Sequence, residues 1–259
     1  MQTSNCELYR FGDFTLDNYR ELVAQALGNG FVFSRYDDFF PSGTRQILWR
    51  HDVEFSPFVA LEMAQIEAAL GARSTFFFQL HGETYNVLER AVSDVVLQVL
   101  ALGHSVGIHF DAHYYGVDSE QNLDRYLELD RGYFEAVFGT EVKVFSFHNT
   151  NPFILSCEKG SYAGMINVYS RYFKENFSYC ADSTGYWRYE RLHDVLNDPE
   201  IAKLQVLTHD AMWSREVLSP RKRVFHSIDC NALRVKRWYD ATLNRFGARN
   251  VDDEACVDG

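Results

Sequence analysis

The feature that most constrains the fold of this chain is a repeated alternation of short apolar runs with amphipathic segments of helical length. Residues 74–80 (STFFFQL) form a continuous apolar run, which is typical of a strand buried on both faces. Before it, residues 57–70 read as a helix, because Ser56 suits an N-cap, Pro57 suits the first helical position and Gly71 suits the helix end. Strand and helix in repeated succession predict parallel strands with helices outside them.

The same alternation continues along the chain. We expect further helices over 15–28, 84–101, 119–138 and 230–246, and further strands over 46–53, 105–110, 142–148, 176–183 and 203–209. No repeat, low-complexity stretch or Pro/Gly/Ser linker interrupts this order, so a single domain over 1–259 is expected, with a frayed polar tail after Gly247. An α/β barrel and an open doubly wound sheet both fit this pattern.

Composition excludes several classes of function. The chain has 25 Lys and Arg against 36 Asp and Glu, a net charge of −11 with no basic run, so nucleic acid and anionic membranes are poor partners. No apolar stretch reaches membrane-spanning length, and the first residues lack the pattern of a secretion signal. The five cysteines are odd in number and none are two apart, which favours reduced, buried thiols in a cytoplasmic protein.

Residues suited to hydrolytic chemistry cluster at the expected strand ends. The strand-end residues are Asp52 and Glu54, His109 and His113, His148, Asp182, and His209. Five strands that bring such residues to one place indicate the barrel, whose active residues lie on the C-terminal face, whereas an open sheet uses mainly the strands beside its switch point. No G-x-G-x-x-G follows a strand, so a dinucleotide site is unsupported.

Two of these pairs could build a metal site. Asp52 and Glu54 point to the same side of a strand, about 6.6 Å apart along it, which leaves room for one to bind a metal and the other to face a water. His109 and His113 would be about 13 Å apart in an extended strand, so sharing one ion requires a helical turn over 109–113. Each pair alone also fits ordinary surface residues, but together they supply the donors of a hydrolytic metal site.

The stretch RHDVEFSPFVALEMAQIEAALGARSTFFF and the later GHSVGIHFDAH resemble the polysaccharide deacetylase family (NodB homology, carbohydrate esterase family four), in particular its RHDVD-type branch. FSFHNTNP (145–152), DSTGYW (182–187) and LTHDAMW (207–213) match further motifs in order, so the resemblance runs from Leu48 to Trp213. It implies a distorted (β/α) barrel of about seven parallel strands with outer helices. It also implies metal-dependent hydrolysis of N-acetyl or related acyl groups on amino sugars, with zinc as the usual metal.

The resemblance also implies roles for individual residues. Asp52 matches the catalytic base, and His209 would be the general acid, with Asp182 orienting it and raising its pKa. The metal ligands would be Glu54, His109 and His113. Substrate contacts are expected from residues beside the motifs, namely His148, Trp187, Trp213 and Arg50.

Two departures from the family pattern bear on activity. Glu54 stands where the family has Asp, and its extra methylene exceeds the ~0.2 Å tolerance of a metal bond unless the backbone adjusts. The third motif lacks the Arg that holds the base, and His148 or Arg50 could take that part. Asp210, directly after the expected general acid, could alter substrate contacts.

Three functions therefore stay open. The first is a metal-dependent hydrolase that removes an N-acyl group from a small amino sugar or a glycan precursor. The second is a catalytically impaired relative that binds carbohydrate or regulates, and the third is a deformylase-type hydrolase of sugar biosynthesis. The sequence indicates no oligomeric state.

Overall fold

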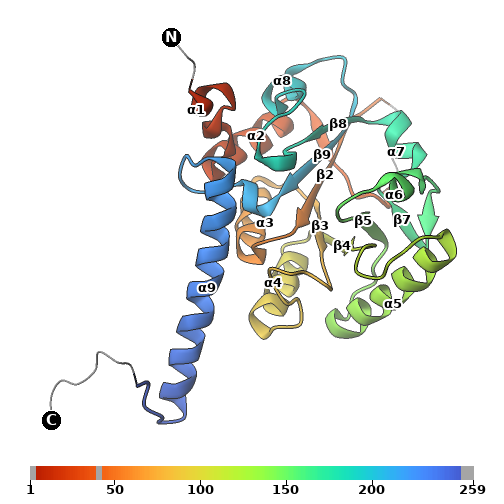
Figure 1. The fold of residues 1–259 in the computed structure, drawn as a ribbon. Helices are drawn as coiled ribbons and strands as arrows, with labels where there is room; N and C mark the ends of the chain where they lie inside the picture. Colours follow the sequence, from red (N-terminus) through yellow and green to blue (C-terminus); the bar gives the residue numbers. More distant parts are fainter. Residues whose placement is uncertain (1–3, 39–42, 252–259) are drawn as a thin grey trace.

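One curled sheet dominates the computed structural model, which describes residues 4–38 and 43–251 (Figure 1). In the described residues the sheet has nine strands in the order β6-β7-β5-β4-β3-β2-β9-β8, with β1 also paired to β2. All neighbours are parallel except β6 and β7. The strands are β1 (Phe31–Phe33), β2 (Arg45–Val53), β3 (Thr75–Phe78), β4 (Ser105–Phe110), β5 (Val144–Phe147), β6 (Ser161–Tyr162), β7 (Met165–Asn167), β8 (Ser178–Ala181) and β9 (Lys203–His209). This half-barrel confirms the expected distorted (β/α) barrel.

Helices surround the sheet. The longer ones are α2 (Leu16–Gly28), α3 (Pro57–Leu70), α4 (Arg90–Ala101), α5 (Glu120–Phe138) and α9 (Pro220–Arg245). The short ones are α1 (Asn5–Leu8), α6 (Pro152–Ser156), α7 (Arg171–Asn176) and α8 (Leu192–Asn197), with 3-10 turns at η1 (Phe11–Phe14), η2 (Ser183–Gly185) and η3 (Asp210–Met212). The expected caps of α3 are confirmed: the Ser56 side chain accepts from the Val59 amide, and Gly71 ends the helix in the left-handed conformation.

Alternation along the strands separates two faces of the sheet. Leu48 and Phe77 point to the inner face, where they join a small cluster inside the half-barrel. Phe76 and Phe78 point outward into the large apolar cluster beneath α4 and α5. Because paired residues of parallel strands share a face, Asp52 of β2 and His209 of β9 point to the same side at the C-terminal edge.

A buried polar network fastens the outer face of β2 to α3. The Glu67 carboxylate, fully buried on α3, bonds to His51 Nε2 (2.9 Å) and accepts from the Tyr19 and Ser74 hydroxyls. His104 Nδ1 accepts from the Ser74 amide and its Nε2 donates to the Ala64 carbonyl, so this imidazole is neutral and has a structural role. Burial lowers the pKa of His104, which agrees with the neutral form.

Several boundaries differ from expectation. The helix expected over 84–101 begins only at Arg90, because the preceding loop is held by the Tyr85 hydroxyl, which donates to the Val53 carbonyl. The last helix begins at Pro220, ten residues before the expected start, and is capped by Ser219. The strands β1, β6 and β7 were not expected, and most of the tail after Gly247 lies outside the described residues.

The cysteines divide into two groups. Cys157 and Cys180 are buried, as expected, whereas Cys6 and Cys230 are exposed, which corrects the expectation of buried thiols for these two. These four are free thiols, and Cys256 lies outside the described residues. Across residues 4–38 and 43–251, no helix combines the length and the apolar character needed to cross a bilayer.

Gly107 allows the inner face of the sheet to pack. A Cβ atom built at this position would lie 2.6 Å from Phe77 Cε1 and 2.7 Å from the Val144 carbonyl oxygen. We expect Gly107→Ala to lower the free energy of unfolding by about 1–3 kcal/mol through overpacking. The matched control is Gly132→Ala in α5, where nothing lies within 4 Å and alanine should stabilise the helix by roughly 0.5–1 kcal/mol. Denaturant unfolding of both variants tests this, and equal effects would contradict it.

Candidate active site

A cavity of about 770 Å³ lies over the C-terminal ends of the strands. Five of the residues singled out from the sequence line it: Asp52, Glu54, His109, His113 and His209. They come from the ends of β2, β4 and β9 and from the loops that follow β2 and β4. The barrel arrangement expected from the strand-end residues therefore brings these side chains to one cavity.

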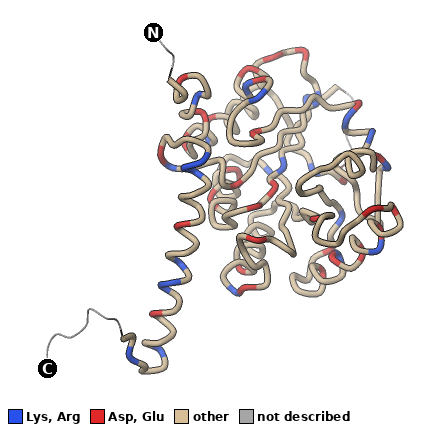
Figure 2. The backbone as a smooth tube through the Cα atoms, viewed as in Figure 1, with Lys and Arg blue, Asp and Glu red and all other residues tan. Residues whose placement is uncertain are grey.

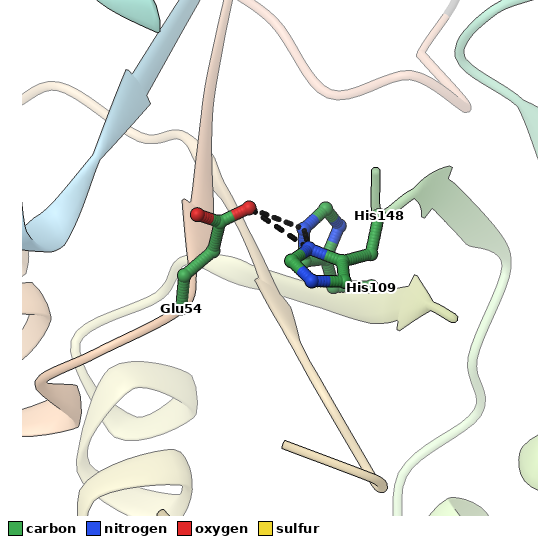
Figure 3. Close-up of side chains that lie close together, drawn as sticks. All are labelled: Glu54, His109 and His148. Carbon is green, nitrogen blue, oxygen red and sulfur yellow. Dashed lines mark hydrogen bonds and ion pairs between the residues drawn. The ribbon is translucent and has the colours of Figure 1, made fainter. Parts of the chain in front are cut away.

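Glu54, His109 and His148 form a compact group of metal-ligating atoms (Figure 3). Glu54 Oε1 lies 3.1 Å from His109 Nε2 and 3.0 Å from His148 Nδ1, and these two nitrogens are 3.1 Å apart. Ligand atoms at tetrahedral corners with ~2.0–2.1 Å bonds to zinc are roughly 3.3 Å apart. The donor types and spacing therefore fit one divalent ion, and the longer Glu54 side chain does reach both imidazoles.

Neighbouring strands set the orientation of His109. In the register of β4 and β5, His109 lies opposite Ser146, and its Nδ1 is 2.7 Å from the Ser146 hydroxyl oxygen. The same hydroxyl donates to Asp52 Oδ1 at 3.1 Å. Ser146 thus connects the expected base to the back of a metal-binding imidazole, as partners behind metal ligands commonly do. The sequence analysis did not single out Ser146.

His148 reaches the group because the chain turns sharply after β5. Its amide donates to the Phe110 carbonyl, and the next residue, Asn149, has a left-handed φ of 46°. Asparagine tolerates this conformation better than most residues. The Asn149 side-chain amide also lies 2.8 Å from His148 Nε2, so it orients the ring from its other side.

The charges of the group favour an ionised carboxylate. Burial alone would raise the pKa of Glu54, but hydrogen bonds from His109 and His148 outweigh it and hold this pKa well below its ordinary value. Burial lowers the pKa of His148, yet the bond to Glu54 and its charge raise it overall. A bound ion would replace the protons that now lie between these ligand atoms.

His113 occupies the rim of the same cavity and lies outside this group. Strand β4 continues to Phe110 and the turn spans 112–116, so the helical turn expected over 109–113 is absent from this part of the described chain. The Asp111 carboxylate accepts from the His113 amide, and His113 Nε2 lies 2.7 Å from the Asn149 carbonyl oxygen. The metal-binding role of His113 stays a prediction from the resemblance.

Asp52 is held at the bottom of the cavity. Only 1% of its surface is exposed, and Arg50 Nη2 lies 3.9 Å from its Oδ2. Arg50 is itself fully buried and packs its guanidinium over the Tyr169 ring at 4.8 Å. Arg50 is thus placed behind the carboxylate, where the missing third-motif Arg was expected to act, and is absent from the cavity lining.

His209 and Asp182 form a second polar unit at the cavity. Asp182 Oδ1 lies 2.6 Å from His209 Nδ1, while its Oδ2 accepts from the His209 amide and the Trp213 indole. Burial alone would lower the pKa of His209, but the charge of Asp182 and its hydrogen bond raise it to about 10. The imidazole is therefore protonated at neutral pH, with Nε2 available to a ligand.

Asp210 has a structural role that the sequence did not reveal. Its buried carboxylate accepts from three successive amides, those of Glu54, Phe55 and Ser56. Burial raises the pKa of Asp210 to about 6 despite these bonds. The expectation that Asp210 contacts substrate is therefore corrected: it fixes the loop that carries Glu54.

The tryptophans pack beneath the site. Trp213 is buried and bonded to Asp182, and Trp187 stacks on Phe14 with ring centroids 5.0 Å apart. Neither belongs to the described cavity lining, so their packing indicates support of the site in place of the expected sugar stacking. The aromatic residues that do line the cavity are Phe55, Phe147, Tyr169 and Tyr179, which the sequence analysis did not select.

No family model matches this sequence, and no curated protein matches it. Three solved structures are similar. A chitin deacetylase from the fungal pathogen Colletotrichum lindemuthianum is 16% identical, with 71% of this chain and 81% of that chain covered and a TM-score of 0.43. The values are 12%, 80%, 99% and 0.43 for a peptidoglycan deacetylase from Bacillus subtilis. They are 12%, 76%, 63% and 0.40 for a carbohydrate esterase family 4 pseudoenzyme from Bacillus anthracis. At these identities the similarity concerns the fold, and the neighbours are of the family that the motifs resemble.

Zinc titration tests which histidines bind metal. We expect His148→Ala to weaken zinc binding at least about tenfold, as His109→Ala should, because each removes one ligand atom of the compact group. His113→Ala should bind zinc nearly as well as the wild type. Calorimetric titration of metal-stripped protein gives the affinities. Loss with His113→Ala but not with His148→Ala would contradict the grouping seen here.

The raised pKa of His209 predicts a pH-dependent stability. An imidazole with a pKa of 6.5 when unfolded and about 10 when folded stabilises fully below pH 6.5 and loses its contribution as pH rises to about 10. Over that window, we expect the free energy of unfolding to fall more steeply in the wild type than in His209→Gln, which has no titrating group here. Denaturant unfolding at several pH values measures both slopes, and parallel slopes would contradict the assignment.

Proposed function

We propose that this protein is a metal-dependent hydrolase that removes an N-acyl group, acetyl in the first instance, from an amino sugar or glycan precursor. The observation that carries the proposal is the meeting of two units across one cavity. One unit is the Glu54–His109–His148 group beside Asp52, and the other is the protonated His209 held by Asp182. A hydrolysed amide needs a base for water and an acid for the amine, and these units supply both.

A divalent ion held by Glu54, His109 and His148 would polarise the acyl carbonyl and acidify the attacking water. Asp52 accepts a proton from that water, while Arg50 and Ser146 hold its carboxylate in place. As the C–N bond breaks, the acyl carbon keeps the water oxygen, and His209 Nε2 donates its proton to the leaving nitrogen. Asp182 keeps the imidazole oriented and charged until that step.

The cavity supports a sugar-sized substrate. Its volume of about 770 Å³ suits a mono- or disaccharide, and ring faces of the kind presented by Tyr169 and Tyr179 stack on sugars. The acidic net charge of −11 disfavours a strongly anionic polymer as substrate. We therefore propose a small cytoplasmic substrate, such as a free or nucleotide-linked amino sugar.

Amine release from a substrate panel tests this function. N-acetyl and N-formyl forms of free and nucleotide-linked amino sugars are incubated with zinc-loaded protein, and the primary amine and the released acid are quantified. We expect turnover that falls by about 10²–10⁴ in Asp52→Asn and His209→Gln, because each removes one proton-transfer group. His193→Gln, an exposed histidine on α8, is the matched control and should retain activity. Preference for formyl over acetyl would select the deformylase alternative.

A catalytically impaired, carbohydrate-binding protein is the second candidate, and the glutamate at position 54 is the observation that favours it. Under this alternative, zinc-loaded protein binds an amino sugar without turnover. Activity that appears only in Glu54→Asp would establish it. Turnover by the wild type would exclude it.

A further inference from the structure

Helix α9 carries an apolar stripe that is exposed in the described part of the chain. The stripe consists of Phe225, Ile228, Ala232, Val235 and Tyr239, and the same spacing continues to Thr242 and Phe246. Phe225, Val235 and Tyr239 are 49%, 47% and 52% exposed. A polar sequence would be the ordinary covering for such a surface.

A different side of α9 contacts the body of the protein. Arg223 and Ser227 are buried, the Asn231 side chain donates to the Thr84 carbonyl, and Arg234 pairs with Glu89. At 3.6 residues per turn, the apolar stripe lies roughly 120° around the helix from these contacts. The C-terminal half of α9 projects past α4 into open space (Figure 1). Both the stripe and the projecting half are therefore accessible to another molecule.

The spacing of the stripe is that of a coiled coil. From Phe225 to Phe246 the steps are 3, 4, 3, 4, 3 and 4 residues, which is the a/d repeat of three heptads. Such a seam is narrower than the apolar face with which a helix normally covers a globular core. The sequence of α9 thus suits pairing with a single other helix.

Charge distribution favours a second copy of this chain. Residues 220–245 contain seven Lys and Arg and two Asp, a net charge of 7 − 2 = +5, and the whole chain carries −11. The remainder therefore carries −11 − 5 = −16, so a basic helix projects from an acidic body (Figure 2). The projecting half of one copy is complementary to the body of another.

We propose that two copies associate through an antiparallel pair of α9 helices. In this register Phe225 faces the partner's Thr242, Ile228 faces the partner's Tyr239, and Ala232 faces the partner's Val235. Asp229 and Lys236 occupy the e positions that flank the seam, so Asp229 of each chain meets the partner's Lys236. The dimer is two-fold symmetric and closes on itself.

A parallel pair fits less well. It would place Ala232 against the partner's Ala232, which leaves a gap in the seam, and Asp229 beside the partner's Val224, without an ion pair. It would also hold the two acidic bodies at the same end of the helices. The antiparallel arrangement keeps the bodies at opposite ends.

Matched substitutions test the stripe. Val235 and Leu233 are almost equally exposed, at 47% and 46%, but only Val235 lies on the seam. In sedimentation velocity over a concentration series, we expect the wild type and Leu233→Glu to form dimers and Val235→Glu to stay monomeric. Circular dichroism confirms that each variant is folded. A wild type that is monomeric throughout, or a dimer unaffected by Val235→Glu, would overturn the proposal.

Charge exchange tests the register. Asp229→Lys and Lys236→Asp should each weaken the dimer, and the double variant should restore it, whereas a parallel pair predicts no such rescue. Flotation with vesicles of phosphatidylserine and phosphatidylcholine examines a lipid surface as the alternative occupant. Monomeric protein that binds these vesicles through Val235 would overturn the dimer and assign the stripe to a membrane surface.

Discussion

Strand β2 buries three ionisable side chains in succession, Arg50, His51 and Asp52, and the fold around it is arranged to compensate them. None is more than 1% exposed. Burial of an unpaired charge is costly, so each needs a partner within reach. Strand alternation sends His51 outward to Glu67 on α3, and sends Arg50 and Asp52 inward to one another. The carboxylate that we assign as the base is thereby fixed from behind before any ligand binds.

The rest of the site is fixed in the same way, by buried acids that bind the backbone. Asp210 holds the loop of Glu54 through three amides, while Asp182 holds His209 through both its amide and its ring. Asp210 and His209 are adjacent, so the end of β9 positions the metal-binding loop and the proton donor together. This arrangement leaves few side chains to reorganise when a substrate enters.

Local signals made much of this fold predictable, and non-local geometry limited the rest. Ser56-Pro57 and Gly71 marked α3, and strand-end chemistry selected Asp52, Glu54, His109 and His209, because both depend on residues close in sequence. The choice between His113 and His148 depends on the turn at Asn149 and on the register of β4 with β5, which no local pattern reveals. Likewise, Trp213 and Asp210 stand beside the general acid in sequence, but their contacts are made with Asp182 and the loop 54–56.

Anomalous diffraction at the zinc edge, from crystals of the zinc-loaded protein, tests the central claim most directly. The account predicts one strong peak about 2.0–2.1 Å from His109 Nε2 and His148 Nδ1 and bonded to Glu54. A peak bound by His113 in place of His148 would mean that the resemblance, and not the geometry described here, identifies the ligands. No peak at this cavity at saturating zinc would contradict the metal site, and with it the hydrolase.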